Sequence, residues 1–114
     1  MSATLLEKLL PLRPADLVLL AELQDGPRHG YALAQAMARR TDGRIRVRPG
    51  DLYRVLFRMS EQGLVAAEAG AEVDPRRKTT YRLTALGDRA LREEARRLAK
   101  LSAEILARPV EDSP

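Results

Sequence analysis

The sequence predicts a mainly helical fold with one small β-hairpin and a long C-terminal helix. Apolar residues recur at helical spacing in three segments between residues 14 and 62. Two short segments with strand character, 64–69 and 79–83, follow and flank a polar stretch. A last helical pattern begins after Thr84 and extends to about Ala107. Three helices, a hairpin and one long helix are therefore the expected order of elements.

The composition indicates one small domain with few groups for catalysis. The chain has 114 residues, no Cys and one His, His29, which excludes disulfides and leaves little for metal sites or His-based catalysis. No carboxylates are paired at useful spacing and no nucleophile lies beside a base, so we expect no enzyme, no metal and no cofactor. The N-terminus has no basic segment followed by a long apolar core, and no apolar run reaches the ~20 residues of a membrane span. We expect a cytoplasmic protein.

Positive charge is concentrated in the middle of the chain. The net charge is +4, but residues 28–58 contain eight Arg and two Asp, a local excess of +6. A basic segment between near-neutral flanks suits a polyanion, and the Arg guanidinium binds phosphates and guanine edges with paired hydrogen bonds. The charge distribution therefore favours nucleic acid as a partner.

Two helices are predicted before the basic segment, a short one at residues 3–10 and a longer one that begins at Pro14. Residues 3–10 have leucines at helical spacing, and a helix this short needs a partner surface. Pro14 fits the first position of the next helix, which extends to about Leu23. The residues expected to face the core in this helix, the first of the three, are Leu17, Val18 and Leu20.

The next two segments are expected to be a helix and a short extended piece. The helix spans about residues 30–40 and is ended by Thr41-Asp42-Gly43, and residues 44–48 alternate Arg and apolar side chains. The side chains expected on the buried side of the helix are Tyr31, Leu33, Ala34 and Met37.

The third helix has the clearest pattern. It is expected to begin at Pro49-Gly50-Asp51, with Asp51 near the N-cap, and to end before Gly63. Leu52, Val55, Leu56 and Met59 form one apolar stripe. The outer face then carries Tyr53, Arg54, Phe57, Arg58 and Glu61.

Three helices followed by a hairpin are the order of a winged helix-turn-helix. In that fold the third helix enters the major groove and the hairpin, or wing, contacts the DNA backbone. The predicted wing tip is basic, with Arg76-Arg77-Lys78. We expect residues 1–12 to form an N-terminal helix, 13–84 the winged-helix domain, 85–108 a dimerisation helix and 109–114 a tail.

Three motifs resemble the signatures of the PadR family of transcriptional regulators. They are HGYALAQAM (29–37), RPGDLYRVLFRMSEQGLV (48–65) and RRKTTYRLTALG (76–87), and the similarity covers about residues 15–94. The resemblance implies a homodimeric DNA-binding repressor with a C-terminal dimerisation helix. For some members it also implies a small-molecule effector pocket at the dimer interface. Asp51 stands where the family usually has Thr or Ser, and Arg54 where Pro is common.

The candidate DNA-binding residues follow from these placements. Arg54 and Arg58 are expected to read bases, and Phe57 either touches a thymine methyl or packs on the second helix. For Tyr31, core packing and phosphate contact are equally plausible. For His29, a local hydrogen bond at the start of the helix is favoured over a role as a proton switch. The residues expected to contact the backbone are Arg46, Arg48, Tyr53, Arg76, Arg77 and Lys78.

The last helix carries an apolar row that a small core has no room to bury. We expect this row to dimerise together with the N-terminal leucines, and the alternative is packing on the chain's own domain. The expected interface residues are Leu5, Leu6, Leu9, Leu91, Leu98, Leu101 and Ile105. The predicted function is a homodimeric repressor that binds a pseudo-palindromic operator in double-stranded DNA, with release by a small-molecule effector as an open addition. The alternative is a winged-helix protein–protein adaptor that does not bind DNA.

Overall fold

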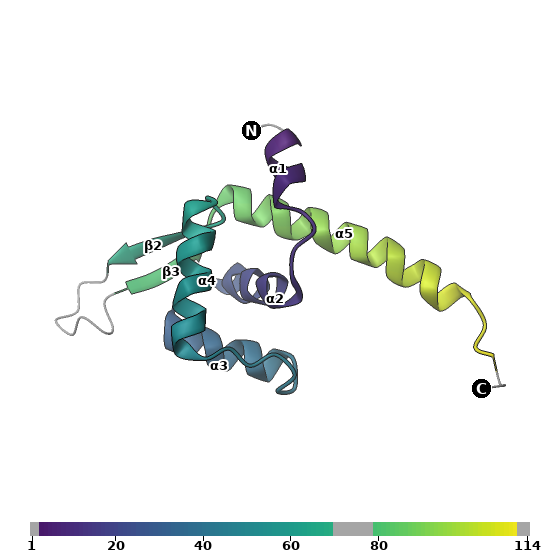
Figure 1. The fold of residues 1–114 in the computed structure, drawn as a ribbon, viewed down its shortest axis with the longest axis horizontal. Coiled ribbons are helices and arrows are strands. Elements are labelled where there is room, and N and C mark those ends of the chain that lie inside the picture. Colours follow the sequence, from purple (N-terminus) through teal and green to yellow (C-terminus); the bar gives the residue numbers. More distant parts are fainter. Residues whose placement is uncertain (1–2, 70–78, 112–114) are drawn as a thin grey trace.

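A computed structural model describes residues 3–69 and 79–111 of the chain (Figure 1). The elements, in order, are α1 (Ala3–Leu9), α2 (Pro14–Glu22), the 3-10 turn η1 (Leu23–Asp25), β1 (Arg28–His29), α3 (Gly30–Arg40), α4 (Pro49–Glu61), β2 (Val65–Ala69), β3 (Thr79–Leu83) and α5 (Ala85–Ala107). The predicted mainly helical class, with a winged helix-turn-helix and a long final helix, is confirmed. The predicted wing-tip residues Arg76, Arg77 and Lys78 lie outside the described residues.

The core is formed by one face of each helix from α2 to α5, together with Leu6 of α1 and the start of β2. Leu19 is fully buried, although only its neighbours in α2 were predicted to face the core, and Leu17 and Val18 are half-buried. The apolar stripe of α4 is buried as predicted, apart from the half-buried Val55. The core residues with at most 2% exposure are Leu19, Leu20, Leu23, Leu33, Met37, Leu52, Leu56, Met59, Leu64, Val65 and Ala90.

Local signals define both ends of α4. Pro49 is its first residue, and the extended Arg48 is the N-cap without a side-chain cap. Asp51 lies near the N-cap as predicted, in the first turn, but its carboxylate pairs with Arg54 and does not cap the helix. At the other end Gly63 has φ +79°, and the Leu64 N–H donates to the Met59 carbonyl at 2.9 Å. This is the Schellman ending that a C′ glycine predicts.

The sheet has the antiparallel order β1-β3-β2. Val65 pairs with Leu83 and Ala69 with Thr79, which confirms the predicted hairpin strands to within one residue. The two-residue strand β1 was not predicted, because two residues carry no periodicity. His29 lies in it, and the His29 Nδ1 is 3.2 Å from the Thr79 carbonyl, so the predicted hydrogen bond of His29 joins the wing instead of the local turn. Residues 44–48 belong to no strand.

The helix α5 is half inside the domain and half outside it. The Thr84 Oγ1 caps the helix by accepting from the Gly87 N–H at 2.9 Å, as predicted. From Ala95 to Ala107 every side chain except Leu98 is exposed, and this half projects from the body in Figure 1. The radius of gyration is 16.4 Å, compared with about 13 Å for a compact chain of this length. None of the helices in the described ranges is long and apolar enough to cross a bilayer.

Candidate nucleic-acid interface

The outer face of α4 presents large side chains to solvent. Since Leu52, Leu56 and Met59 occupy the core side, the residues between them face outward. Phe57 is 68% exposed and Tyr53 47%, and the Arg54 side chain is 80% exposed. The alternative that Phe57 packs on the preceding helix is therefore wrong. An apolar ring and a guanidinium now lie one turn apart on a free helix surface.

The N-terminal ends of α3 and α4 lie against each other. A Cβ atom built on Gly30 would lie 2.9 Å from Cε1 of Tyr53, so only glycine permits this contact without movement of the ring. Tyr31 is 68% exposed, which corrects the prediction that it faces the core, and its hydroxyl accepts from Nε2 of Gln35 at 3.2 Å. Burial raises the pKa of Tyr81 on β3, and the nearby Tyr53 raises it further. Since the Tyr53 ring lies against Gly30, and the two residues before Gly30 pair with β3, the wing strand lies at this end of α4.

Arg54 is held by a neighbour on the same helix. Its Nη2 donates to Oδ1 of Asp51, one turn earlier, and both side chains are exposed. Asp51 and Arg54, the two residues that differ from those usual in the PadR family, therefore contact each other. Neither side chain contributes to the core, so their geometry affects what the surface can bind.

Arg58 is turned toward α2. Its Nη2 lies 3.0 Å from both Oδ1 and Oδ2 of Asp16, a residue that is only 5% exposed, and its Nη1 donates to Oε1 of Gln62 at 3.3 Å. The structure thus separates the two predicted base-reading arginines, because Arg54 is exposed and Arg58 pairs within the domain. Base contact by Arg58 stays a prediction, and it requires the pair with Asp16 to open.

The segment before α4 supplies uncompensated positive charge. Asp42 and Gly43 have φ values of +52° and +77° and turn the chain after α3. The Arg46 Nε donates to the Gly43 carbonyl at 3.1 Å. Within the described residues, four exposed arginines of the basic segment have no ion-pair partner: Arg39, Arg44, Arg46 and Arg48. No group of three His, Cys, Asp or Glu side chains suited to a metal ion occurs among those same residues.

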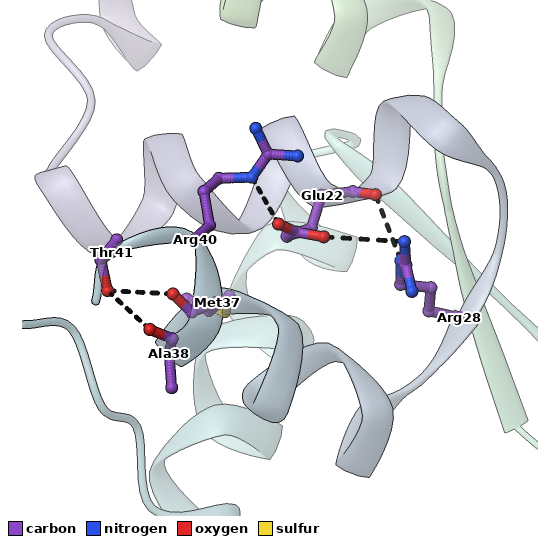
Figure 2. A network of polar contacts seen from close by, with 6 residues as sticks. All are labelled: Glu22, Arg28, Met37, Ala38, Arg40 and Thr41. Atoms are coloured by element: carbon purple, nitrogen blue, oxygen red, sulfur yellow. Dashed lines mark hydrogen bonds and ion pairs between the residues drawn. The ribbon is translucent and has the colours of Figure 1, made fainter. Parts of the chain in front are cut away.

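Glu22 ties α2, β1 and α3 together (Figure 2). This carboxylate is 4% exposed and accepts from the Arg40 Nε, and it lies 3.7 Å from Arg28 Nη2. The hydrogen bond with Glu22 raises the pKa of Arg40. The Thr41 hydroxyl donates to the Met37 carbonyl at 3.0 Å at the end of α3. Arg28 and Arg40 therefore join Arg58 as arginines of the basic segment that pair with a buried carboxylate of α2. Sequence reasoning missed these pairs because the partners lie in different elements.

The predicted dimer residues fall into two groups. Leu6 and Leu91, at 9% and 5% exposure, belong to the chain's own core, so the structure contradicts their availability to a partner chain. Their burial follows from the contact of α1 with the first half of α5 (Figure 1). The predicted residues that keep accessible surface are Leu5, Leu9, Leu98, Leu101 and Ile105, and Leu106 and Val110 add to the exposed apolar surface.

Glu94 is a buried acid that lies within the apolar row of α5. Its side chain has 0% exposure, and its Oε2 accepts from the backbone N–H of Leu12 at 2.6 Å. Its Oε1 accepts from Nε of Arg97 at 2.5 Å. The hydrogen bond from Arg97 lowers the pKa of Glu94, burial opposes this effect, and the Leu12 N–H adds to it. This contact fastens the segment between α1 and α2 to α5.

Comparisons with known proteins agree with this arrangement. The family model described as "Transcriptional regulator PadR-like family" matches residues 19–93. The transcriptional regulator Rv3488 of Mycobacterium tuberculosis is 38% identical over 88 residues, which cover 77% of this chain and 78% of the relative. A transcriptional regulator from Clostridium thermocellum has a similar structure, with a TM-score of 0.68 at 20% identity over 97% of this chain and 99% of its own. Bacillus subtilis PadR, solved in complex with operator DNA, has a TM-score of 0.63 at 18% identity over 91% of this chain and 52% of its own.

Proposed function

Because the chain belongs to the PadR-like family of transcriptional regulators, we propose that it binds a specific duplex DNA sequence as a homodimer and represses transcription there. The observation that carries the proposal is the free outer face of α4. This face exposes Tyr53, Arg54 and Phe57. It is preceded by Arg48, which has no ion-pair partner among the described residues. The Bacillus subtilis relative, which shares the fold, was solved with its operator DNA.

The proposed complex places α4 in the major groove, which is wide enough for a helix. Arg54 then reaches base edges, and Phe57 offers an apolar surface to a thymine methyl group. Backbone contacts hold the helix in register and carry no base information themselves. We assign these backbone contacts to Arg46, Arg48 and Tyr53, and to Arg76, Arg77 and Lys78 of the wing, which lie outside the described residues.

The homodimer is proposed to form through the projecting half of α5. Leu101 and Ile105, which are 43% and 60% exposed, lie on one face of this helix, and a second copy would remove that surface from water. Two α4 helices related by a twofold axis then bind half-sites about 10 base pairs apart, or a multiple of this distance. Release by a small-molecule effector stays a prediction.

The proposal predicts specific and strongly salt-dependent DNA binding. Selection from a random duplex pool should recover a pseudo-palindromic site, which the protein binds at least ~10³-fold more tightly than random DNA. The logarithm of the association constant should fall by about 0.9 per phosphate contacted for each unit in log salt. Arg48→Ala should reduce that slope by about 1 for both selected and random duplexes.

Arg96→Ala is the matched control, because this exposed arginine lies on α5 and pairs with Glu93. Its slope should equal that of the wild type. An affinity that does not change with salt, with no sequence enriched by selection, would contradict the proposal and favour the protein–protein adaptor.

The dimer makes a separate prediction. Leu101→Lys should raise the dimer dissociation constant about 10-fold or more, because each protomer loses a buried leucine. Sedimentation equilibrium measures this change directly. Ala103→Lys introduces the same side chain on the opposite, exposed face of α5 and should leave the constant unchanged. Equal dimer constants for the two variants would place the interface elsewhere.

A further inference from the structure

We propose that Asp51 determines base specificity by holding Arg54 for a guanine, and that Phe57 reads a thymine methyl beside it. Each half-site would then contain a guanine and, one or two base pairs away, an A·T pair. The inference rests on the proposed function, since it assumes that α4 lies in the major groove. It adds which bases the helix selects and which residue imposes the selection.

The contact between Asp51 and Arg54 leaves the guanidinium able to bind a base. A guanidinium has five N–H donors, and the bond from Nη2 to Asp51 Oδ1 uses one of them. The remaining donors are sufficient for the paired hydrogen bonds to O6 and N7 of guanine. A long side chain that is already held in one orientation loses less conformational freedom on binding. Asp51 therefore positions Arg54 for a base edge and opposes its movement to a phosphate.

Apart from the modest favourable interaction of a first-turn acid with the helix dipole, Asp51 adds little to the stability of the fold. Both partners are exposed, and an exposed ion pair contributes little to stability. Its negative charge repels the DNA backbone, so it lowers the affinity for every duplex alike. A residue that weakens general binding while it orients a base-reading side chain increases the difference between correct and incorrect sequences, which is what specificity measures.

Phe57 supplies the second part of the reading surface. It is 68% exposed and is not part of the core cluster, so its ring is available to a ligand. It follows Arg54 by three residues, a rise of about 4.5 Å along the helix, close to the ~3.4 Å between successive bases. The thymine C5-methyl is the apolar group that the major groove displays. A ring at this position therefore favours an A·T pair near the guanine.

Modified bases and one matched pair of variants test the inference. Asp51→Asn removes the charge that holds Arg54, and Asp88→Asn removes the same charge from an exposed Asp–Arg pair in the first turn of α5. On the selected site, replacing the guanine by 7-deazaguanine, which lacks N7, or by another base should weaken the wild type about 5- to 100-fold. Asp51→Asn should bind random DNA more tightly than the wild type and lose most of this guanine discrimination. Asp88→Asn should behave as the wild type.

The thymine contact has its own probe. Uracil in place of the thymine removes one methyl group and should weaken the wild type about 3- to 4-fold. Phe57→Ala should show no difference between the two bases. Thermal unfolding of Phe57→Ala should match that of the wild type, and that of Asp51→Asn should match that of Asp88→Asn, which loses the same first-turn charge. These measurements separate a change in base reading from a change in fold.

The outcomes distinguish the inference from the function on which it rests. Selected sites without a shared guanine, or guanine discrimination that is equal in Asp51→Asn and the wild type, would overturn the role of Asp51. An equal effect of uracil on the wild type and on Phe57→Ala would overturn the role of Phe57. A wild type without any preference among duplexes would instead overturn the proposed function itself.

Discussion

Gly87→Ala is expected to lower the free energy of unfolding by about 3 kcal/mol or more. A Cβ atom at this position would lie 2.0 Å from the Leu64 carbonyl oxygen and 2.8 Å from Cδ1 of Leu83. The Leu64 oxygen cannot recede easily, because it accepts from both the backbone N–H and the hydroxyl of Thr84, at 3.2 and 3.0 Å. The start of α5 would have to separate from the start of β2. Urea denaturation at equal protein concentration measures the loss.

Gly50→Ala is the matched control for this substitution. Gly50 lies in the first turn of α4, and a Cβ atom built there has no neighbour within 4 Å. Since alanine is the better helix former, the variant should be unchanged or more stable by up to about 1 kcal/mol. Equal stability of Gly87→Ala and Gly50→Ala would show that α5 does not approach Leu64 closely.

The second large effect is expected at Glu94. Glu94→Ala should cost about 2–4 kcal/mol, because it leaves the Leu12 N–H without its acceptor and opens a cavity under the segment before α2. Glu94→Gln keeps an oxygen for Leu12 but loses the charge that faces Arg97, and should cost about 1 kcal/mol. Glu104→Ala, at an exposed position of the same helix, should stay within about 0.5 kcal/mol of the wild type.

The pH dependence of stability provides an independent check on Glu94. Its pKa is lower in the folded chain than in the unfolded chain, so folding favours the ionised form. This contribution is complete above the unfolded pKa of about 4.3 and is lost as the pH falls through the folded pKa. The difference in unfolding free energy between the wild type and Glu94→Gln should therefore shrink below about pH 4. A difference that stays constant down to pH 2 would show that the carboxylate of Glu94 carries no such stabilisation.

These two residues explain how one helix serves both the domain and the proposed dimer. Gly87 lets the start of α5 approach the start of β2, and Glu94 holds the segment after α1 against the same helix. Both contacts lie in the first half of α5, which packs against the domain. They therefore hold in place the base of the exposed half that begins at Ala95. We expect the angle between the two α4 helices of a dimer to depend on this base.

Elements that depend on local chemistry could be predicted from the amino-acid sequence. Pro49 and Gly63 mark the ends of α4, and Thr84 caps α5, each through contacts within a few residues. The apolar stripe of α4 follows from the helical repeat alone. The same stripe determines which side chains face outward, so the exposure of Arg54 and Phe57 was predictable, and so was the basic character of the surface around them.

Which charged and apolar side chains stay exposed depends on how the helices pack, and the sequence pattern did not reveal it. Arg58 and Asp16 are 42 positions apart, and Glu94 and Leu12 are 82 apart. No periodicity or cap predicts such pairs, because they depend on how helices pack and not on the local chain. For the same reason Leu91, which belongs to the apolar row expected to contact a partner chain, is buried in the core of its own chain. A sequence pattern shows that a side chain needs a partner, whereas the fold decides which partner is within reach.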